Sequence, residues 1–333
     1  MWNLLSLRAS TLLAGMTLAA GATVAVAADL PSRKMEPAPL MTQLPAVDGI
    51  NAKLEVFGGL TQRLSQDPTA PFFQRNQWRP ASGLLGSVTF PVGNSFGLQL
   101  DGGIATGGGV FSAALGGHAF WRDPSKALFG VYASGTRYSR AGGIVVGRVA
   151  PEAEIYLGRV TLQGVAGVEF GSNKGYTYGY PWFVPGTTFL TLNQNAVRTR
   201  FFDIASIAFY PVDDLKLAVG QRYVFGKLAA AASAEYLVTH GPTAVSVFAE
   251  GRLGQRGASA VFGGLKVYFG QRDKSLIRRH REDDPINHHM DTATSGGGYG
   301  NSGGSGLPIV TCAPTPDMGV GSTGAFVAGC GAL

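Results

Sequence analysis

The chain has 333 residues, of which 45% are hydrophobic and only 14% charged, with a formal net charge of +6. This balance is more apolar than an ordinary soluble exported domain needs, yet no segment after the first 27 residues holds the ~18 consecutive apolar residues of a membrane-spanning helix. The basic residues are scattered and form no nucleic-acid-binding motif, which argues against a nucleic-acid partner.

The first 27 residues predict a secretory signal peptide. Arg8 lies in a short amino-terminal region, an apolar run extends from residue 11 to about residue 26, and residues 25–27 (Ala-Val-Ala) have the small-x-small pattern of a cleavage site. Glycines and alanines within the run make an uncleaved membrane anchor the weaker alternative. We therefore expect residues 1–27 to be removed on export and residues 28–51 to form a periplasmic amino-terminal segment.

Short alternating segments from residue 52 to residue 270 predict an all-β fold, an antiparallel transmembrane β-barrel. A closed barrel satisfies every backbone hydrogen bond in lipid, and its strands point alternate side chains at lipid and at the lumen. Leu217, Val219 and Phe225 fall on one face of such a segment, whereas Lys216 and Arg222 fall on the other. We count about twelve segments, with ten or fourteen as alternatives. They lie near 52–62, 82–91, 96–106, 109–122, 127–139, 143–157, 160–171, 199–210, 215–226, 228–238, 243–254 and 258–270.

The connections between these segments sort by length. The two longest, about 63–81 and 172–198, fall at the same end of the expected barrel. In outer-membrane barrels with both termini in the periplasm, every second connection is short. The connections at the opposite end are all short and rich in Gly, Pro, Asp and Asn, and they are 92–95, 122–126, 157–159, 211–214 and 239–242.

Charged residues on the inward rows are the candidate pore-lining residues. Their mixed signs allow two arrangements, in which they either pair and plug a narrow barrel or line an aqueous path for small solutes. The sequence favours neither arrangement. The candidates are Asp101, Arg148, Glu152, Glu154, Glu169, Lys216, Arg222, Glu250, Arg252 and Lys266, and Glu55 and Glu235 lie on the same rows.

No catalytic residue, metal or cofactor is expected. His118 lies on an inward row, and we expect its ring to be a buried filler that nearby serine and threonine side chains satisfy. His240 lies in a short connection, so neither histidine is at the outer rim where a surface hydrolase would act. The aromatic stretch 176–185 is either an interface girdle with a self-packed loop, which we favour, or a ligand-stacking surface or pore constriction.

Residues 271–333 predict a low-complexity, flexible periplasmic tail. Its first part, to residue 291, is charged and is expected to be solvated, because its histidines lack metal-ligand spacing. A Gly/Ser-rich linker follows at 295–306. Cys312 and Cys330 are expected to form one disulfide in the oxidising periplasm, which would pin only the tail.

Two short stretches carry a resemblance to known proteins. Residues 28–34 (ADLPSRK) resemble the mature start of porins and porin-like outer-membrane proteins of the alphaproteobacteria, and residues 273–285 resemble a tail of uncharacterised outer-membrane proteins. The resemblance implies the outer membrane as compartment and the broad class of the protein, but not porin activity. The expected partners are membrane lipid, lipopolysaccharide and the barrel-assembly machinery. From the signal peptide, the alternation and the sorting of the connections, we expect a porin-like barrel that passes small hydrophilic solutes passively. The alternative is a structural or adhesive barrel with a plugged lumen, and a barrel hydrolase is the weaker third hypothesis.

Overall fold

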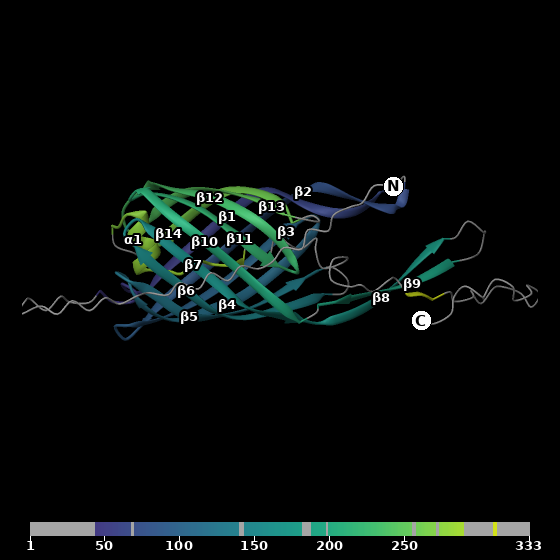
Figure 1. Cartoon of the computed structure of the whole chain (residues 1–333), viewed down its shortest axis with the longest axis horizontal. Coiled ribbons are helices and arrows are strands. Elements are labelled where there is room, and N and C mark those ends of the chain that lie inside the picture. The colour runs from purple at the N-terminus through teal and green to yellow at the C-terminus, as the bar shows by residue number, and fades with distance from the viewer. Residues whose placement is uncertain are drawn as a thin grey trace, which may run out of the picture. The chain divides into compact units, whose positions relative to one another are not determined.

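The computed structural model describes residues 44–67, 70–139, 143–181, 188–197, 199–254, 258–270, 273–289 and 309–311, all within the structural unit Gln43–Leu333. Twelve antiparallel strands form a closed barrel, and Figure 1 shows the barrel from the side. The prediction of twelve strands is confirmed, and the alternatives of ten or fourteen are wrong. The strands are β1 (Asn51–Asp67), β2 (Ala70–Val92), β3 (Phe96–Gly107), β4 (Val110–Asp123), β5 (Ala127–Tyr138), β6 (Ile144–Leu157), β7 (Val160–Gly171), β10 (Arg200–Val212), β11 (Leu215–Val224), β12 (Lys227–Thr239), β13 (Ala244–Gly254) and β14 (Ala260–Phe269).

The barrel closes where its first strand meets its last. β1 pairs with β14 in a register that runs from Ala52 opposite Phe269 to Thr61 opposite Ala260. In all the remaining neighbouring pairs of the ring but one, the two strands follow each other in the sequence. The exception is β7, which pairs with β10. Because the ring is closed, it leaves no strand edge with unpaired backbone groups.

Side chains along each strand sort into an apolar exterior and a polar interior. On β3, Leu98 and Leu100 are exposed on the outside, at 40% and 55%, whereas Gln99 and Asp101, which alternate with them, are buried in the lumen. A water-soluble barrel would place the apolar row inside instead. The sequence therefore has the two-residue period that strands require, with its oily face turned outward.

One residue departs from the expected sorting. Phe225 was expected on the apolar outer face, but it is buried inside the barrel, where the Arg148 guanidinium lies 4.8 Å from its ring. It forms a two-residue turn with Gly226 between β11 and β12, with φ of 58° and 70° at the two positions. Positive φ at both positions is the type I′ pattern. The strand alternation has ended there, and the prediction for Phe225 is wrong.

The two ends of the barrel differ. One end, here called the turn end, carries the five short connections predicted from the sequence and also the start of β1 and the end of β14. At the opposite end, here called the hairpin end, β8 (Asn173–Pro181) and β9 (Thr188–Ala196) form a hairpin between β7 and β10, and β15 (Ile309–Thr311) pairs with β9. The expected loop 172–198 is thus largely a β-hairpin, and residues 182–185 of the aromatic stretch lie outside the described residues.

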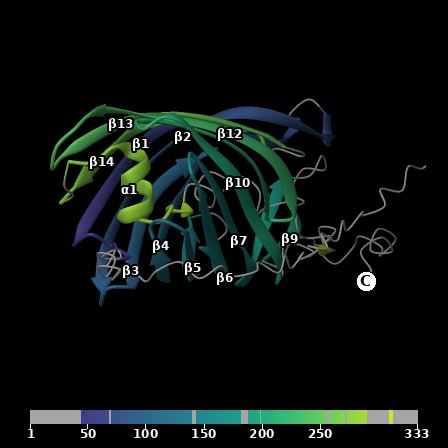
Figure 2. The ribbon, with the colours of Figure 1, turned by 60° about the vertical axis from the view of Figure 1, so that its left-hand side comes forward.

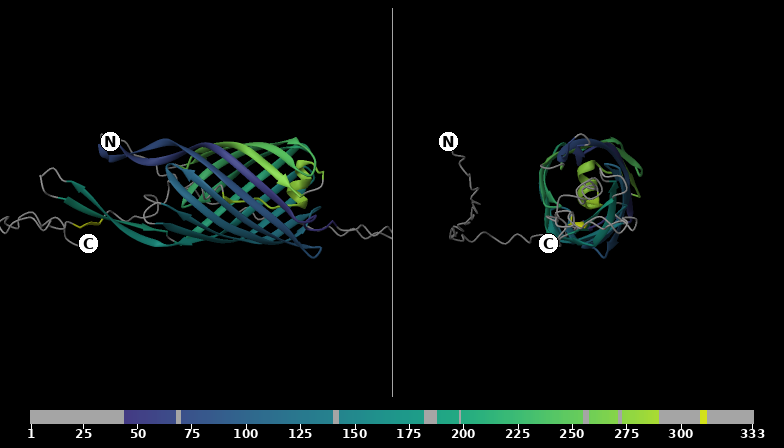
Figure 3. Two further views of the ribbon diagram at one scale, coloured as in Figure 1. Left: turned by 180° about the vertical axis from the view of Figure 1, so that it is seen from behind. Right: turned by 90° about the vertical axis from the view of Figure 1, so that its right-hand side faces the viewer.

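The lumen is occupied. After β14 the chain turns back inside the barrel as a short helix, α1 (Leu276–Glu282), followed by residues 283–289, of which 284–287 have no regular secondary structure. Figure 2 shows α1 within the mouth of the barrel, and the end-on view in Figure 3 shows it encircled by the strands. We call residues 273–289 the plug. Within the described part of the chain, no helix has the length and apolar character needed to cross a membrane.

Candidate functional site

The plug is anchored first to the turns beside it. The backbone N–H of Leu276 donates to Asp214 Oδ1 at 3.1 Å, and that of Ile277 donates to the Asp213 carbonyl at 3.0 Å. The Leu276 side chain is fully buried against Leu237 and Tyr268. These contacts satisfy amino-terminal N–H groups that a helix leaves without internal partners. The first turn of α1 is therefore fixed to the β10–β11 connection.

Two arginines of α1 reach the backbone of other connections. The buried Arg279 guanidinium donates to the carbonyls of Lys274 at 3.1 Å and Gly241 at 3.0 Å. Arg281 donates to the Val160 carbonyl at 3.0 Å, close to the β6–β7 turn. The fork of donors on a guanidinium suits such carbonyl contacts. The helix is thus tied to three connections of the turn end.

Lys274 gathers the carboxylates around the base of the plug. Its ammonium lies 3.1 Å from Asp48, 3.1 Å from Glu282 and 2.8 Å from Asp283, and its side chain is almost fully buried. Burial raises the pKa of Asp283 to about 7, with Asp284 and Glu282 acting in the same direction and Lys274 against them. Three carboxylates thus share one buried cation at the base of the plug.

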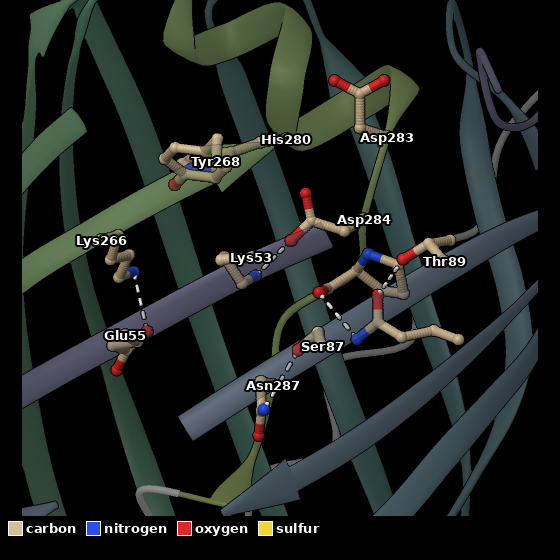
Figure 4. Close-up of polar contacts among 12 residues, drawn as sticks. Lys53, Glu55, Ser87, Thr89, Lys266, Tyr268, His280, Asp283, Asp284 and Asn287 are labelled. Carbon is tan, nitrogen blue, oxygen red and sulfur yellow. Dashed lines mark hydrogen bonds and ion pairs between the residues drawn. The ribbon is translucent and has the colours of Figure 1, made fainter. Parts of the chain in front are cut away.

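The part of the plug that follows α1 is bound by inward-facing side chains of the first strands, as Figure 4 shows. Lys53 of β1 forms a buried ion pair with Asp284. Gln99 donates to the Pro285 carbonyl at 3.3 Å, and Asn287 donates to Ser87 Oγ at 3.1 Å. Backbone without regular secondary structure is thereby satisfied inside the barrel, as buried polar groups require.

His280 projects from α1 into a second polar cluster. Its Nδ1 lies 2.9 Å from the Tyr210 hydroxyl and its Nε2 lies 3.3 Å from the Tyr268 hydroxyl. Glu235 accepts from Tyr268 at 2.5 Å and from Lys266 at 2.8 Å. Burial lowers the pKa of His280 to about 4, with Lys216 and Lys266 adding to the effect and Glu235 opposing it. The imidazole is therefore neutral at pH 7.

His118 lies deeper in the lumen between two acids. Its Nδ1 is 2.7 Å from Glu152 and its Nε2 is 2.9 Å from Asp101. The expectation that serine and threonine satisfy this ring is wrong, because carboxylates occupy both nitrogens. With both nitrogens engaged, His118 does not form the Ser–His pair that a serine hydrolase needs.

The plug meets this cluster at its far end. The His288 ring packs edge-on against Tyr132, with 5.3 Å between ring centroids, and lies 6.0 Å from the His118 ring. His289 is fully buried. Burial lowers the pKa of His289. Among the described residues, no group of three or more His, Cys, Asp or Glu side chains is arranged to hold a metal ion.

The ten pore-lining candidates all lie on the lumen side of their strands, and most pair with one another or with the wall. Arg148 contacts Glu169 at 3.3 Å, and Glu250 contacts Arg222 at 3.0 Å and Arg252 at 2.5 Å. Glu154 accepts from Tyr156 at 2.9 Å. The remaining four take part in the clusters already described or line a cavity beside the plug. They are Asp101, Glu152, Lys216 and Lys266. Whether any of them lines a conducting path stays a prediction.

A polar cavity remains beside the plug. It encloses about 1240 Å³, counting the part continuous with solvent, and plug residues His280, Asp284 and Asn287 form part of its wall. Lys216, Arg222 and Glu250 of the barrel face it. The plug therefore fills only part of the lumen's cross-section.

No protein-family model matches the chain, and no curated protein matches its sequence. Among solved structures, the translocator domain of the autotransporter NalP from Neisseria meningitidis is similar over 66% of this chain and 88% of that one, at 10% identity and a TM-score of 0.43. The toluene transporter TbuX of Ralstonia pickettii is similar over 69% and 92%, at 7% identity and a TM-score of 0.41. A FadL homologue of Pseudomonas aeruginosa is similar over 68% and 92%, at 10% identity and a TM-score of 0.36.

Sequence reasoning missed the plug. The charged stretch 271–291 was expected to be solvated, but within it Lys274, Arg279 and Asp283 are buried in the lumen. Charge complementarity explains why these side chains are buried, since the inward rows of the barrel supply partners of both signs. The signal was the stretch's near balance of acids and bases directly after the last strand, but a solvated tail has the same composition. Cys312, Cys330 and the expected signal peptide lie outside the described residues.

Proposed function

We propose that the chain is an outer-membrane β-barrel held closed by its own plug, and that it serves as a surface-exposed membrane anchor rather than as an open pore. The observation that carries this proposal is the plug itself, whose charged side chains pair with the lumen wall. A lumen kept open for passive diffusion would present those wall charges to water instead.

The exterior of the barrel supports the membrane assignment. Large apolar side chains are exposed around the ring, among them Leu115 at 74%, Val219 at 61% and Phe129 at 53%. Exposing so many in water would oppose solubility, whereas lipid solvates them and a closed ring leaves no polar strand edge in the hydrocarbon. Export by cleavage of residues 1–27 and a turn end facing the periplasm complete the proposal.

The closure rests on pairs that are hard to break one at a time. Lys53–Asp284 and the cluster around Lys274 are almost completely removed from solvent. Removing one partner of a buried pair typically costs ~3–5 kcal/mol, because the other charge is left buried and uncompensated. Docking of the plug is therefore sensitive to the loss of any one of these charges.

A second candidate is a gated channel that passes small hydrophilic solutes when the plug shifts. The cavity beside the plug favours it, since charges of both signs face this space and would set a field across a solute path. This candidate keeps the passive transport expected from the sequence but makes it conditional on the plug.

Conductance of the refolded full-length protein in planar bilayers separates these functions. We expect almost no openings at moderate voltage. A steady open conductance would contradict the closed barrel. Frequent reversible openings would favour the gated channel, provided that a disulfide between Ser87→Cys and Asn287→Cys, in a Cys312→Ser/Cys330→Ser background, abolishes them.

Fractionation tests the compartment separately. We expect the mature protein in the outer-membrane fraction. Recovery in the soluble periplasmic extract would contradict the membrane assignment, whatever the conductance.

A further inference from the structure

We propose that the barrel carries its own carboxy-terminal segment through the lumen, from the turn end to the hairpin end, so that β15 is displayed at the cell surface. This inference rests on the proposed function, because it needs a barrel inserted with its turn end in the periplasm. To the proposed membrane anchor it adds the segment that the anchor displays outside the cell.

The segment enters at the turn end. β14 ends at Phe269, opposite Ala52 near the start of β1. α1 then binds connections of this same end through Asp213, Asp214 and Gly241. The chain therefore begins its return path at the mouth that faces the periplasm in the proposed orientation.

By residue 289 the chain has reached the middle of the barrel. Asn287 hydrogen-bonds Ser87 of β2, five residues before that strand ends at the turn end. The His289 ring lies against Gly116, where an added Cβ would come within 3.0 Å of ring atom Cε1. Gly116 is six residues from the hairpin-end start of β4 and seven from its turn-end finish. The plug thus runs along the barrel axis, away from the mouth where it entered.

The next described residues lie beyond the other mouth. Ile309–Thr311 pair with Leu190–Leu192 of β9, which continues outward from β10 at the hairpin end. From the level of Gly116 to β15 the path along β4 and β9 is about 14 residues, or about 46 Å at ~3.3 Å per residue. The 19 residues from 290 to 308 can extend to ~60 Å, so the lumen route is within reach.

A route outside the barrel is disfavoured on physical grounds. The chain at residue 289 would have to turn back past α1 at the turn end and then cross the lipid-facing exterior. Residues 295–306 are rich in Gly and Ser, and an extended polar backbone in hydrocarbon leaves its N–H and C=O groups without partners. A route through the lumen avoids this penalty, because the charged lumen wall offers hydrogen-bonding partners to the backbone.

The arrangement gives the hairpin end a composite feature. β8, β9 and β15 form a three-stranded sheet whose third strand comes from the far end of the sequence. Backbone pairing of β15 with β9 holds the emerging segment at the barrel's outer rim, as in strand-addition recognition. Docking there and plugging within the lumen hold the same segment at two points.

Sidedness of thiol labelling in intact cells tests the inference. The variant Cys330→Ser keeps Cys312, the residue directly after β15. Two reference variants in the Cys312→Ser/Cys330→Ser background place a thiol in known positions, Ser139→Cys at the hairpin end and Lys126→Cys in the turn-end β4–β5 connection. Both reference positions are exposed. An epitope added after Leu333 gives a second readout, independent of the accessibility of a single thiol.

We expect a membrane-impermeant maleimide to label Cys312 and Ser139→Cys in intact cells, and Lys126→Cys only after the outer membrane is permeabilised. An antibody should bind the epitope on intact cells. Suppose that Ser139→Cys is labelled in intact cells but that Cys312 and the epitope, like Lys126→Cys, both become accessible only after permeabilisation. The inference is then overturned and the proposed function stands. If Ser139→Cys itself needs permeabilisation, the orientation fails, and the inference fails with it.

Discussion

Lys53 and Asp284 are 231 positions apart in the chain, and their side chains form an ion pair inside the barrel with 8% and 1% of their surfaces exposed. The lysine belongs to the first strand and the aspartate follows the last. Each charge satisfies a group that would otherwise be buried alone. The pair therefore links docking of the plug to the wall that encloses it.

Asp284→Ala should weaken docking of the plug by ~3 kcal/mol, because Lys53 would remain buried without its partner. Faster proteolysis within residues 276–289 of the micelle-bound protein measures the change. Asp213→Ala is the matched control, since its pair with Arg159, at 2.8 Å, is exposed on both sides. An exposed pair contributes ~0–1 kcal/mol. Equal effects of the two substitutions would show that burial of the Lys53 pair is unimportant.

His280 should make docking of the plug sensitive to acid. The docked pKa of His280, about 4, lies below its ordinary value of 6.5. The docked form therefore binds fewer protons, and docking weakens as the pH falls from 6.5 to 4. The groups that face this ring are Tyr210 of β10, Lys216 of β11, Glu235 of β12, and Lys266 and Tyr268 of β14.

Asp283 acts in the opposite direction. Its docked pKa of about 7 lies above its ordinary value of 3.8, so docking weakens as the pH rises between them. Comparing variants separates the two groups. Proteolysis within residues 276–289 should be slower in His280→Gln than in the unmodified protein at pH 4.5, and slower in Asp283→Asn than in the unmodified protein at pH 7.5. An effect of ~1–3 kcal/mol is expected for each group. Identical pH profiles for all three proteins would remove both histidine and aspartate as the cause.

Leu100→Arg should destabilise the inserted barrel by ~2–4 kcal/mol, because it places a charge at mid-depth on the lipid face. Leu100 is exposed on the outer face near the middle of β3. Val92→Arg is the control on the same face, at the turn-end limit of β2, where ~0–1 kcal/mol is expected. Denaturant unfolding from lipid vesicles measures both. Similar losses at the two positions would contradict an apolar belt that spans a membrane.

His118→Ala should destabilise the barrel by ~3–5 kcal/mol, because Asp101 and Glu152 would face each other without the ring that binds both. Adding Asp101→Asn and Glu152→Gln to the same protein should recover much of the loss, since two neutral amides can remain buried more cheaply. Denaturant unfolding gives both values. Unchanged stability combined with the loss of a lipase or protease activity would instead favour a hydrolase.

The barrel could be predicted because its determinants are local. The alternation of Leu98, Gln99, Leu100 and Asp101 is visible in four consecutive letters, and the period of two fixes which face each side chain takes. Phe225 escaped this rule, because a turn with two positive φ angles inverts its direction within one residue.

The candidate site could be predicted only as an inward row. Pairing of Lys53 with Asp284, or of His118 with Glu152, depends on how strands are staggered around the ring and on where the chain goes after β14. Nothing in a charged stretch distinguishes a segment that docks from one that stays in water. That distinction belongs to the partner surface, which exists only once the ring has formed.

The closing contact between β1 and β14 also constrains biogenesis. The plug follows β14 directly, so these residues leave the ribosome after every strand of the barrel, while the seam that completes the cylinder joins the first barrel strand to the last. If the barrel closed early, the plug would have to enter a closed, charged lumen afterwards. Closing the seam around a segment that already lies inside avoids that barrier, so residues 273–289 have to be in place before β1 pairs with β14.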